Sequence, residues 1–81
     1  MVYKTKGVCS RAIEFEVEDN IIKSVSFVGG CHGNTQGVAK LAEGRNIDEV
    51  IRLLDGIKCG FKSSSCPDQL ACALKEYKEQ N

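Results

Sequence analysis

The chain has 81 residues, which suits one domain spanning residues 1–81, and its eleven basic and eleven acidic side chains cancel. A balanced charge without a basic stripe argues against a nucleic-acid or anionic-membrane partner. The first ten residues, MVYKTKGVCS, lack the apolar run of a signal peptide, and no stretch is apolar enough to span a membrane. We therefore expect a cytoplasmic protein whose small core gains stability from a metal or from a homodimer partner.

The first third of the chain predicts an antiparallel sheet of three strands. Residues 2–6, VYKTK, are expected to form a short edge strand. In residues 11–20, RAIEFEVEDN, apolar side chains alternate with glutamates, which is typical of a half-buried strand with a solvated acidic face. Asp19-Asn20 is turn chemistry, and residues 21–30, IIKSVSFVGG, read as the next strand.

Two helices are expected next. The Gly-rich segment GGCHGN, residues 29–34, breaks the strand, and Asn34 can cap a helix that stops at Gly44. Asn46, with Glu49 three residues later, predicts the start of a second helix, and Gly56 suits its C-terminal cap. The apolar faces of these helices are predicted to carry Val38, Leu41 and Ala42, and Ile47, Val50, Ile51 and Leu54.

The stretch SSSCPDQLACAL, residues 63–74, opens a last helix, expected over about residues 67–79. Ser65 and Cys66 are the N-cap candidates, and this position favours the thiolate form of Cys66. At about 100° per residue, Leu70 shares its face with Ala73, Leu74 and Tyr77, whereas Cys72 lies roughly 200° away. Strands followed by helices predict an α+β domain with three helices on one face of the sheet.

Five cysteines in a reducing compartment favour metal binding or thiol chemistry over a disulfide framework. Pairing the apolar residues of the two strands places Ile13 opposite Phe27, and this register, extended outward, brings Cys9 opposite Cys31. A two-residue Asp19-Asn20 turn would shift the pairing by one residue, so a longer loop or a bulge is expected. Cys9 and Cys31 are neighbours in either case.

The other two candidate ligands, Cys59 and Cys66, flank the connection into the last helix. If that helix packs on the sheet, its N-terminus reaches the same corner, and four thiolates suit zinc or an iron–sulfur cluster. We therefore predict a metal site formed by Cys9, Cys31, Cys59 and Cys66, without Cys72. His32 could serve as a further ligand, although an exposed loop histidine is the favoured interpretation.

The segments GGCHGN, GIKCGFK and SSCPDQLACAL resemble the TSCPD family, named for its Thr-Ser-Cys-Pro-Asp motif, with Ser64 in place of the threonine. The resemblance runs from about Gly7 to the end of the chain. The family includes small stand-alone proteins with four characteristic cysteines and a C-terminal domain of cobalamin-dependent ribonucleoside-diphosphate reductases. It implies the same four cysteines that the spacing singles out, and a link to deoxyribonucleotide synthesis.

A more distant similarity is to iron–sulfur scaffold proteins of the IscU and NifU type, which place three ligands at positions matching Cys9, Cys31 and Cys66. It implies an IscU/NifU-like fold. Their aspartate after the first cysteine is Arg11 here, and their histidine before the third is Ser65. Because that aspartate helps to make the scaffold cluster labile, its replacement and the added Cys59 imply a closed, more permanent site.

Three functions are compatible with the chain, which is too small to be a reductase by itself. The first is a metal-binding accessory module, with zinc or an iron–sulfur cluster, acting beside a ribonucleotide reductase or another redox enzyme. The second is a thiol-redox partner that uses a pair such as Cys9 and Cys31, although the chain has no CxxC motif. The third is a nucleotide- or flavin-binding module built on the GGCHGN loop and a dimer interface.

Overall fold

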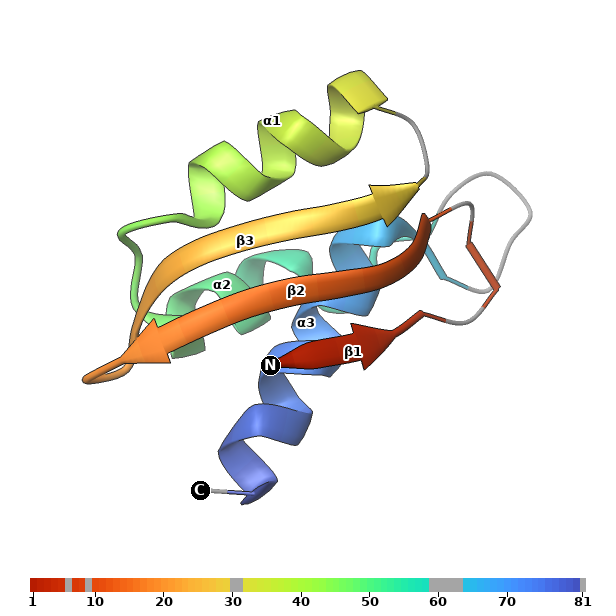
Figure 1. Ribbon diagram of the computed structural model, residues 1–81. Helices are drawn as coiled ribbons and strands as arrows, with labels where there is room; N and C mark the ends of the chain where they lie inside the picture. Colours follow the sequence, from red (N-terminus) through yellow and green to blue (C-terminus); the bar gives the residue numbers. More distant parts are fainter. Residues whose placement is uncertain (6, 9, 30–31, 59–63, 81) are drawn as a thin grey trace.

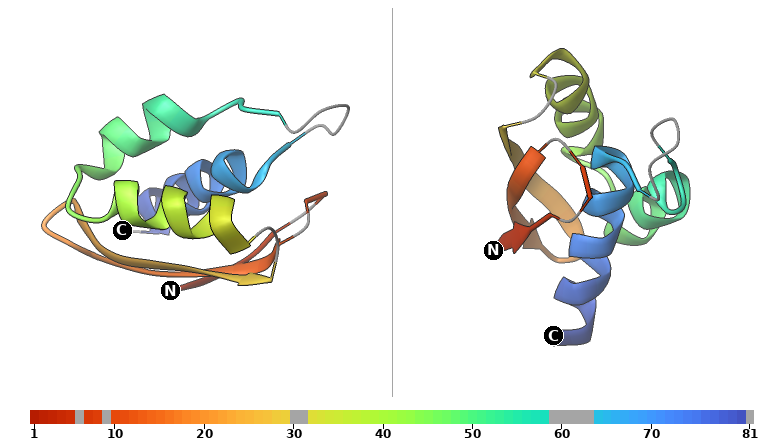
Figure 2. Two further views of the ribbon diagram at one scale, coloured as in Figure 1. Left: turned by 90° about the horizontal axis from the view of Figure 1, so that it is seen from above. Right: turned by 90° about the vertical axis from the view of Figure 1, so that its right-hand side faces the viewer.

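A three-stranded antiparallel sheet is followed by three helices in the computed structural model, which describes residues 1–5, 7–8, 10–29, 32–58 and 64–80. The elements are β1 (Val2–Lys4), β2 (Ser10–Glu18), β3 (Ile21–Gly29), α1 (His32–Ala42), α2 (Ile47–Leu54) and α3 (Cys66–Gln80), with β2 in the centre of the sheet (Figure 1). The helices all lie on one side of the sheet (Figure 2). The predicted α+β architecture is confirmed.

The β2–β3 hairpin has the predicted register at its centre. Ile13 pairs with Phe27 and Phe15 with Val25. Asp19 and Asn20 have φ values of 54° and 64°, as a tight two-residue turn requires. A register shift between Glu16 and Val17 reconciles this turn with the apolar pairing, so the expected irregularity is a bulge.

A second irregularity lies at the open end of the hairpin. Ala12 pairs with Val28 and Ser10 with Gly29, so the register shifts by one residue around Arg11. The regular register would have placed Ser10 opposite Gly30, and its outward extension is wrong by one residue at this point. Cys9 and Cys31, whose direct opposition the extension predicted, lie outside the described residues.

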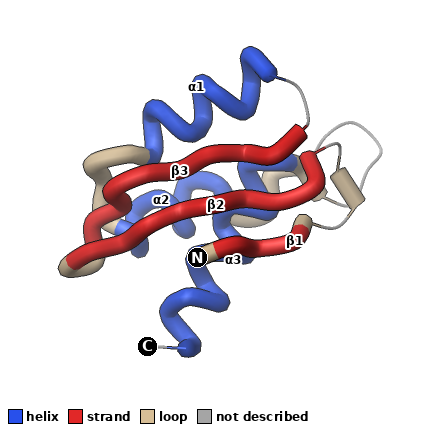
Figure 3. The backbone as a smooth tube through the Cα atoms, viewed as in Figure 1, coloured by secondary structure: helices blue, strands red, loops and turns tan. Residues whose placement is uncertain are grey.

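The core is formed by the inner face of the hairpin and by buried residues of all three helices. Both α2 and α3 lie behind the sheet in Figure 3, and Figure 2 shows that α3 lies between the sheet and α2. Phe15 is 2 % exposed and meets Tyr77 edge to face, with ring centroids 6.1 Å apart. Because α3 is covered from two sides, it buries Ala71 in addition to the predicted face. The other buried apolar residues of α3 are Leu70, Ala73 and Leu74.

The two shorter helices differ in how well their sequences predicted them. Helix α1 begins at His32, two residues before the predicted cap Asn34, and its Leu41 is 68 % exposed instead of buried. Helix α2 is capped as predicted, with the Asn46 side chain accepting from the Asp48 amide, and Gly56 takes a positive φ of 84° after its end. No helix in the described ranges has the length and apolar character needed to cross a bilayer.

Candidate metal corner

Of the four predicted ligands, the structure places Cys66, while Cys9, Cys31 and Cys59 lie outside the described residues. Cys66 is the first residue of α3 and is half-buried. Within the described ranges, no three His, Cys, Asp or Glu side chains gather as metal ligands would. The four-cysteine set therefore stays a prediction, and the surroundings of Cys66 are what the structure contributes to it.

Cys66 lies where α3 meets the open end of the hairpin. Its thiol donates to the Ser10 hydroxyl, with 3.2 Å between Sγ and Oγ, and Ser10 is only 3 % exposed. Ser10 opens β2 and pairs with Gly29, the last residue of β3. The start of β2, the end of β3 and the start of α3 therefore meet at one corner, at the right-hand end of Figure 1.

The end of α2 is tied to the same corner through the cap of α3. The Ser65 hydroxyl accepts from the Asp68 amide at 3.1 Å, which makes Ser65 the N-cap of α3. Ser65 was one of the two N-cap candidates that the sequence predicted. The same hydroxyl donates to the Ile57 carbonyl at 2.6 Å. Ile57 precedes Cys59 by two residues, so this hydrogen bond fixes the chain close to the third predicted ligand.

Sequence reasoning missed the polar side chains that this corner buries. Ser64, Ser65 and Gln69 are 7 %, 4 % and 6 % exposed, and Gln69 Nε2 donates to Ser64 Oγ at 2.9 Å. The available signal was the Ser-x-x-Asp spacing of residues 65–68, which is typical of a capping box. That pattern predicts a helix cap, but it does not reveal that the hydroxyls also hold a neighbouring segment.

Cys72 lies on a different part of α3, as predicted. It lies six positions after Cys66, which amounts to about 9 Å along the helix axis and about 120° around it. It is half-buried, and burial followed by the nearby Asp68 carboxylate raises the pKa of its thiol above the ordinary value. Burial, followed by Cys72 and by the Glu76 and Asp68 carboxylates, raises the pKa of Tyr3 above its ordinary value.

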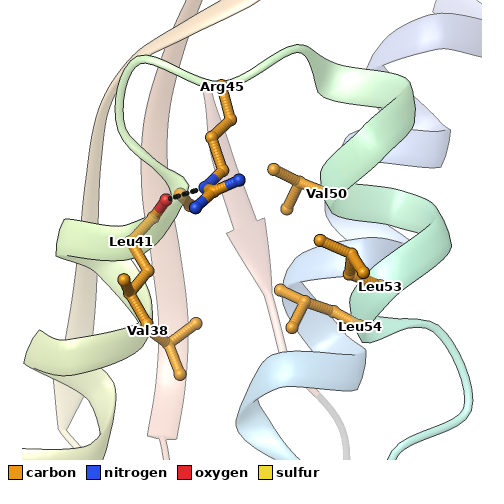
Figure 4. Close-up of a pocket in the computed structure, with 7 residues that line it drawn as sticks. Val38, Leu41, Arg45, Val50, Leu53 and Leu54 are labelled. Carbon is orange, nitrogen blue, oxygen red and sulfur yellow. Dashed lines mark hydrogen bonds between the residues drawn. The ribbon is translucent and has the colours of Figure 1, made fainter.

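An apolar groove of about 160 Å³ lies between α1 and α2 (Figure 4). The half-exposed Leu53 and the exposed Leu41 line it, and Arg45 closes one end by donating to the Leu41 carbonyl and the Glu49 carboxylate, each at 2.7 Å. Small-molecule sites usually measure about 300–1,000 Å³. The groove is smaller than this range, and the Arg45 guanidinium is already engaged in hydrogen bonds. The groove therefore adds no support to the nucleotide or flavin hypothesis.

Comparison with known proteins adds the family. No match to the chain was found among curated proteins, nor among solved structures. The similarity to IscU- and NifU-type scaffolds therefore rests on sequence positions alone. Residues 1–78, nearly the whole chain, match the TSCPD domain, in agreement with the motif at residues 64–68. The chain belongs to the TSCPD domain family.

Proposed function

We propose that this domain is a metal-binding module that holds one zinc ion or iron–sulfur cluster with Cys9, Cys31, Cys59 and Cys66. The observation that carries the proposal is the contact of Cys66 with Ser10, at 3.2 Å, beside the Ser10–Gly29 pair. Ser10 adjoins Cys9, Gly29 precedes Cys31 by two residues, and Ile57 precedes Cys59 by two. Since one residue spans under about 4 Å, the corner is within reach of all four thiols.

The chemistry of the corner suits a metal-bound thiolate. Cys66 donates to Ser10 as a thiol, but a serine hydroxyl both donates and accepts, so Ser10 can donate to the sulfur once the proton has left. Four protein ligands would leave no open position for water, which is the pattern of structural zinc sites and not of catalytic ones. When bound, the metal would join the start of β2, the end of β3 and the two sides of the connection between α2 and α3.

Metal analysis of protein purified without oxygen tests the proposal. We expect about one zinc ion or one cluster per chain, and the visible spectrum separates the two because zinc has no visible absorption of its own. A flavin spectrum would instead favour the third hypothesis. Metal-free protein that melts as high as the purified form, even after zinc is added back, would contradict a structural site.

We further propose that the module acts beside a ribonucleoside-diphosphate reductase or another redox enzyme. The support is the family resemblance, because the related domain forms the C-terminus of cobalamin-dependent reductases. The test is to add the purified module to such a reductase from which that domain has been removed. Restored turnover is expected, and unchanged turnover with fully metal-loaded module would contradict this partner.

A further inference from the structure

The outer edge of β3 is closed over only the first half of its length. At Ile22, the main-chain N–H and C=O pair with Arg45 and Gly44 of the connection between α1 and α2. At Val25, the amide donates to the Glu43 carboxylate of the residue that follows α1. Both contacts occupy groups that would otherwise pair with another strand, so they protect this part of the edge.

The second half of the edge is open at Phe27. The Phe15 amide donates to the Met1 carbonyl, and its carbonyl accepts from the Met1 amine, so Phe15 faces β1. Alternation along β2 makes Glu14 face β3, and its partner Ser26 therefore faces β2. The next residue, Phe27, directs its main-chain N–H and C=O away from the sheet, and no group in the described ranges pairs with them there.

A hollow of about 230 Å³ lies beside this open stretch, between β3 and α1. Figure 1 shows α1 beyond the β3 edge, and Figure 2 shows it on the helix side of the sheet. Neighbouring strands lie about 4.8 Å apart, so the hollow lies where a fourth strand would run. Open main-chain groups of β3 border this space on one side, and polar side chains of α1 border it on the other.

The charges of the hollow come from Lys40 and Glu43. Helix α1 runs antiparallel to β3, and Glu43 lies at the level of Val25 because of their hydrogen bond. Phe27 lies about 6.6 Å further along the strand, and Lys40 lies about 4.5 Å back along the helix, so the two are at similar levels. Lys40 is exposed and forms no ion pair with any described residue. It is the cation available to a strand beside Phe27.

We propose that the β3 edge binds an extended peptide segment of a partner protein, which adds as a fourth strand beside Phe27 and carries an acidic side chain opposite that residue. In this mode of recognition, main-chain hydrogen bonds hold the peptide and its alternate side chains give specificity. Side chains that are directly opposite in an antiparallel pair lie on the same face. Phe27 packs against the core on the helix side, so the acid opposite it points toward Lys40.

A second copy of the chain fits this edge less well. Antiparallel pairing of two β3 strands about Phe27 would relate the copies by a two-fold axis. Because α1 lies beyond the edge of its own sheet, the two α1 helices would enter the same space (Figure 1). Such pairing would also place one Phe27 opposite the other and leave Lys40 without an acid.

The test is a titration of ¹⁵N-labelled protein with an end-capped peptide, Thr-Val-Glu-Val-Thr, followed by NMR. We expect the Phe27 amide signal to shift and its hydrogen exchange to slow. The matched peptide Thr-Val-Gln-Val-Thr, which lacks the charge, should bind about two- to fivefold more weakly, the range of an exposed ion pair. Equal binding of the two peptides, or no shift of the Phe27 amide at millimolar concentration, would overturn the proposal.

Two lysine variants locate the charge. Lys40→Gln should remove the preference for the acidic peptide. Lys23→Gln is the control, because Lys23 is an exposed lysine of the same strand that does not line the hollow, and the preference should persist. The opposite pattern would overturn the assignment to this edge.

A third variant tests the main-chain bonds. Phe27→Pro removes the outward donor at a place where an edge strand tolerates proline, and it should abolish binding of both peptides. Full binding by folded Phe27→Pro protein would contradict strand addition, and if this variant does not fold, the lysine pair still decides. A Phe27 amide that shifts with protein concentration alone, with a doubled mass in sedimentation, would show that a second copy occupies the edge and would overturn the proposal.

Discussion

The two ends of the hairpin are closed by different kinds of interaction. At the turn end, main-chain hydrogen bonds join the hairpin to the α1–α2 connection: the Ile22 amide donates to the Arg45 carbonyl at 3.0 Å, and the Gly44 amide donates to the Ile22 carbonyl at 2.7 Å. The Ile47 amide also donates to the Asn20 carbonyl. Backbone groups make these hydrogen bonds, and the Glu43 carboxylate adds a side-chain bond by accepting from the Val25 amide at 3.3 Å.

At the cysteine end, side chains perform the same task. Buried serines, Gln69 and Asp68 supply the hydrogen bonds, and Cys66 bonds to Ser10. Burying polar side chains costs stability unless every one is paired, so a small domain gains little by placing them in its core. The difference suggests that the turn end serves folding, while the cysteine end is shaped for the proposed metal.

The largest test of this contrast compares the two cysteines of α3. A structural zinc site contributes on the order of 10 kcal/mol of apparent folding free energy in small domains. Cys66→Ser should therefore lose the metal and melt at a much lower temperature. Cys72→Ser, about 120° around the same helix from Cys66, should keep both. Metal content and thermal unfolding of the two variants are the measurements, and equal behaviour would rule out the four-cysteine site.

A smaller loss of stability is expected when a side chain of the hydrophobic core is truncated. Phe15 is buried against the edge of Tyr77, and Phe15→Ala should lower the free energy of unfolding by about 3–5 kcal/mol in urea titrations. Val2→Ala, at a side chain that is 61 % exposed, is the control and should change it by less than about 0.5 kcal/mol.

Metal content must be read in the same two samples. Both variants should keep one metal per folded chain, because neither residue contacts the cysteine end. Loss of metal from folded Phe15→Ala protein would show that the core and the corner are not separable.

Local periodicity in the sequence was enough to predict the centre of the fold. Alternation along β2 set the central register, and its conflict with the Asp19-Asn20 turn predicted a longer loop or a bulge, of which the structure has the bulge. The helical periodicity of α3 predicted that Leu70 and Leu74 are buried. It did not predict the burial of Ala71, because periodicity does not reveal that α2 covers a second face of the helix. Leu41 was misassigned for the converse reason: its face of α1 is left uncovered.

The candidate site was predictable only in its residue types. Cysteine spacing indicated a metal and left out Cys72, but hydrogen bonds between segments far apart in sequence carry no periodic signal. Ser10 and Cys66 are separated by 56 positions, and the pairing of Gly56 with Asp68 joins two helix ends. The shift around Arg11 was missed for the same reason, since no turn or apolar pattern marks it.

The two helix caps allow a finer comparison, since they lie at opposite ends of the molecule and make similar local bonds. Asn46 accepts from the Asp48 amide at 2.8 Å, and Ser65 accepts from the Asp68 amide at 3.1 Å. Either residue changed to Ala should cost about 1 kcal/mol of unfolding free energy. Only Ser65→Ala should also weaken zinc binding, because it frees the Ile57 carbonyl. Equal zinc affinities of Ser65→Ala and Asn46→Ala would contradict the view that only the cysteine end is shaped for a metal.

The smallest effect concerns Cys72, the thiol of α3 that the proposed metal site leaves out. Burial and Asp68 raise the pKa of Cys72 above its ordinary value of 9.0, and Lys75 partly opposes them. Because the folded state favours the protonated thiol, any resulting stability is present below the unfolded pKa and lost as the pH rises through the folded one. The rate at which iodoacetamide labels Cys72 should therefore rise with pH, and the midpoint pH of this rise should be higher for the metal-loaded protein than for the urea-unfolded chain. Fragment masses locate the label. Asp68→Asn should lower the midpoint and Lys75→Gln should raise it, and the opposite order would show that other charges control this thiol.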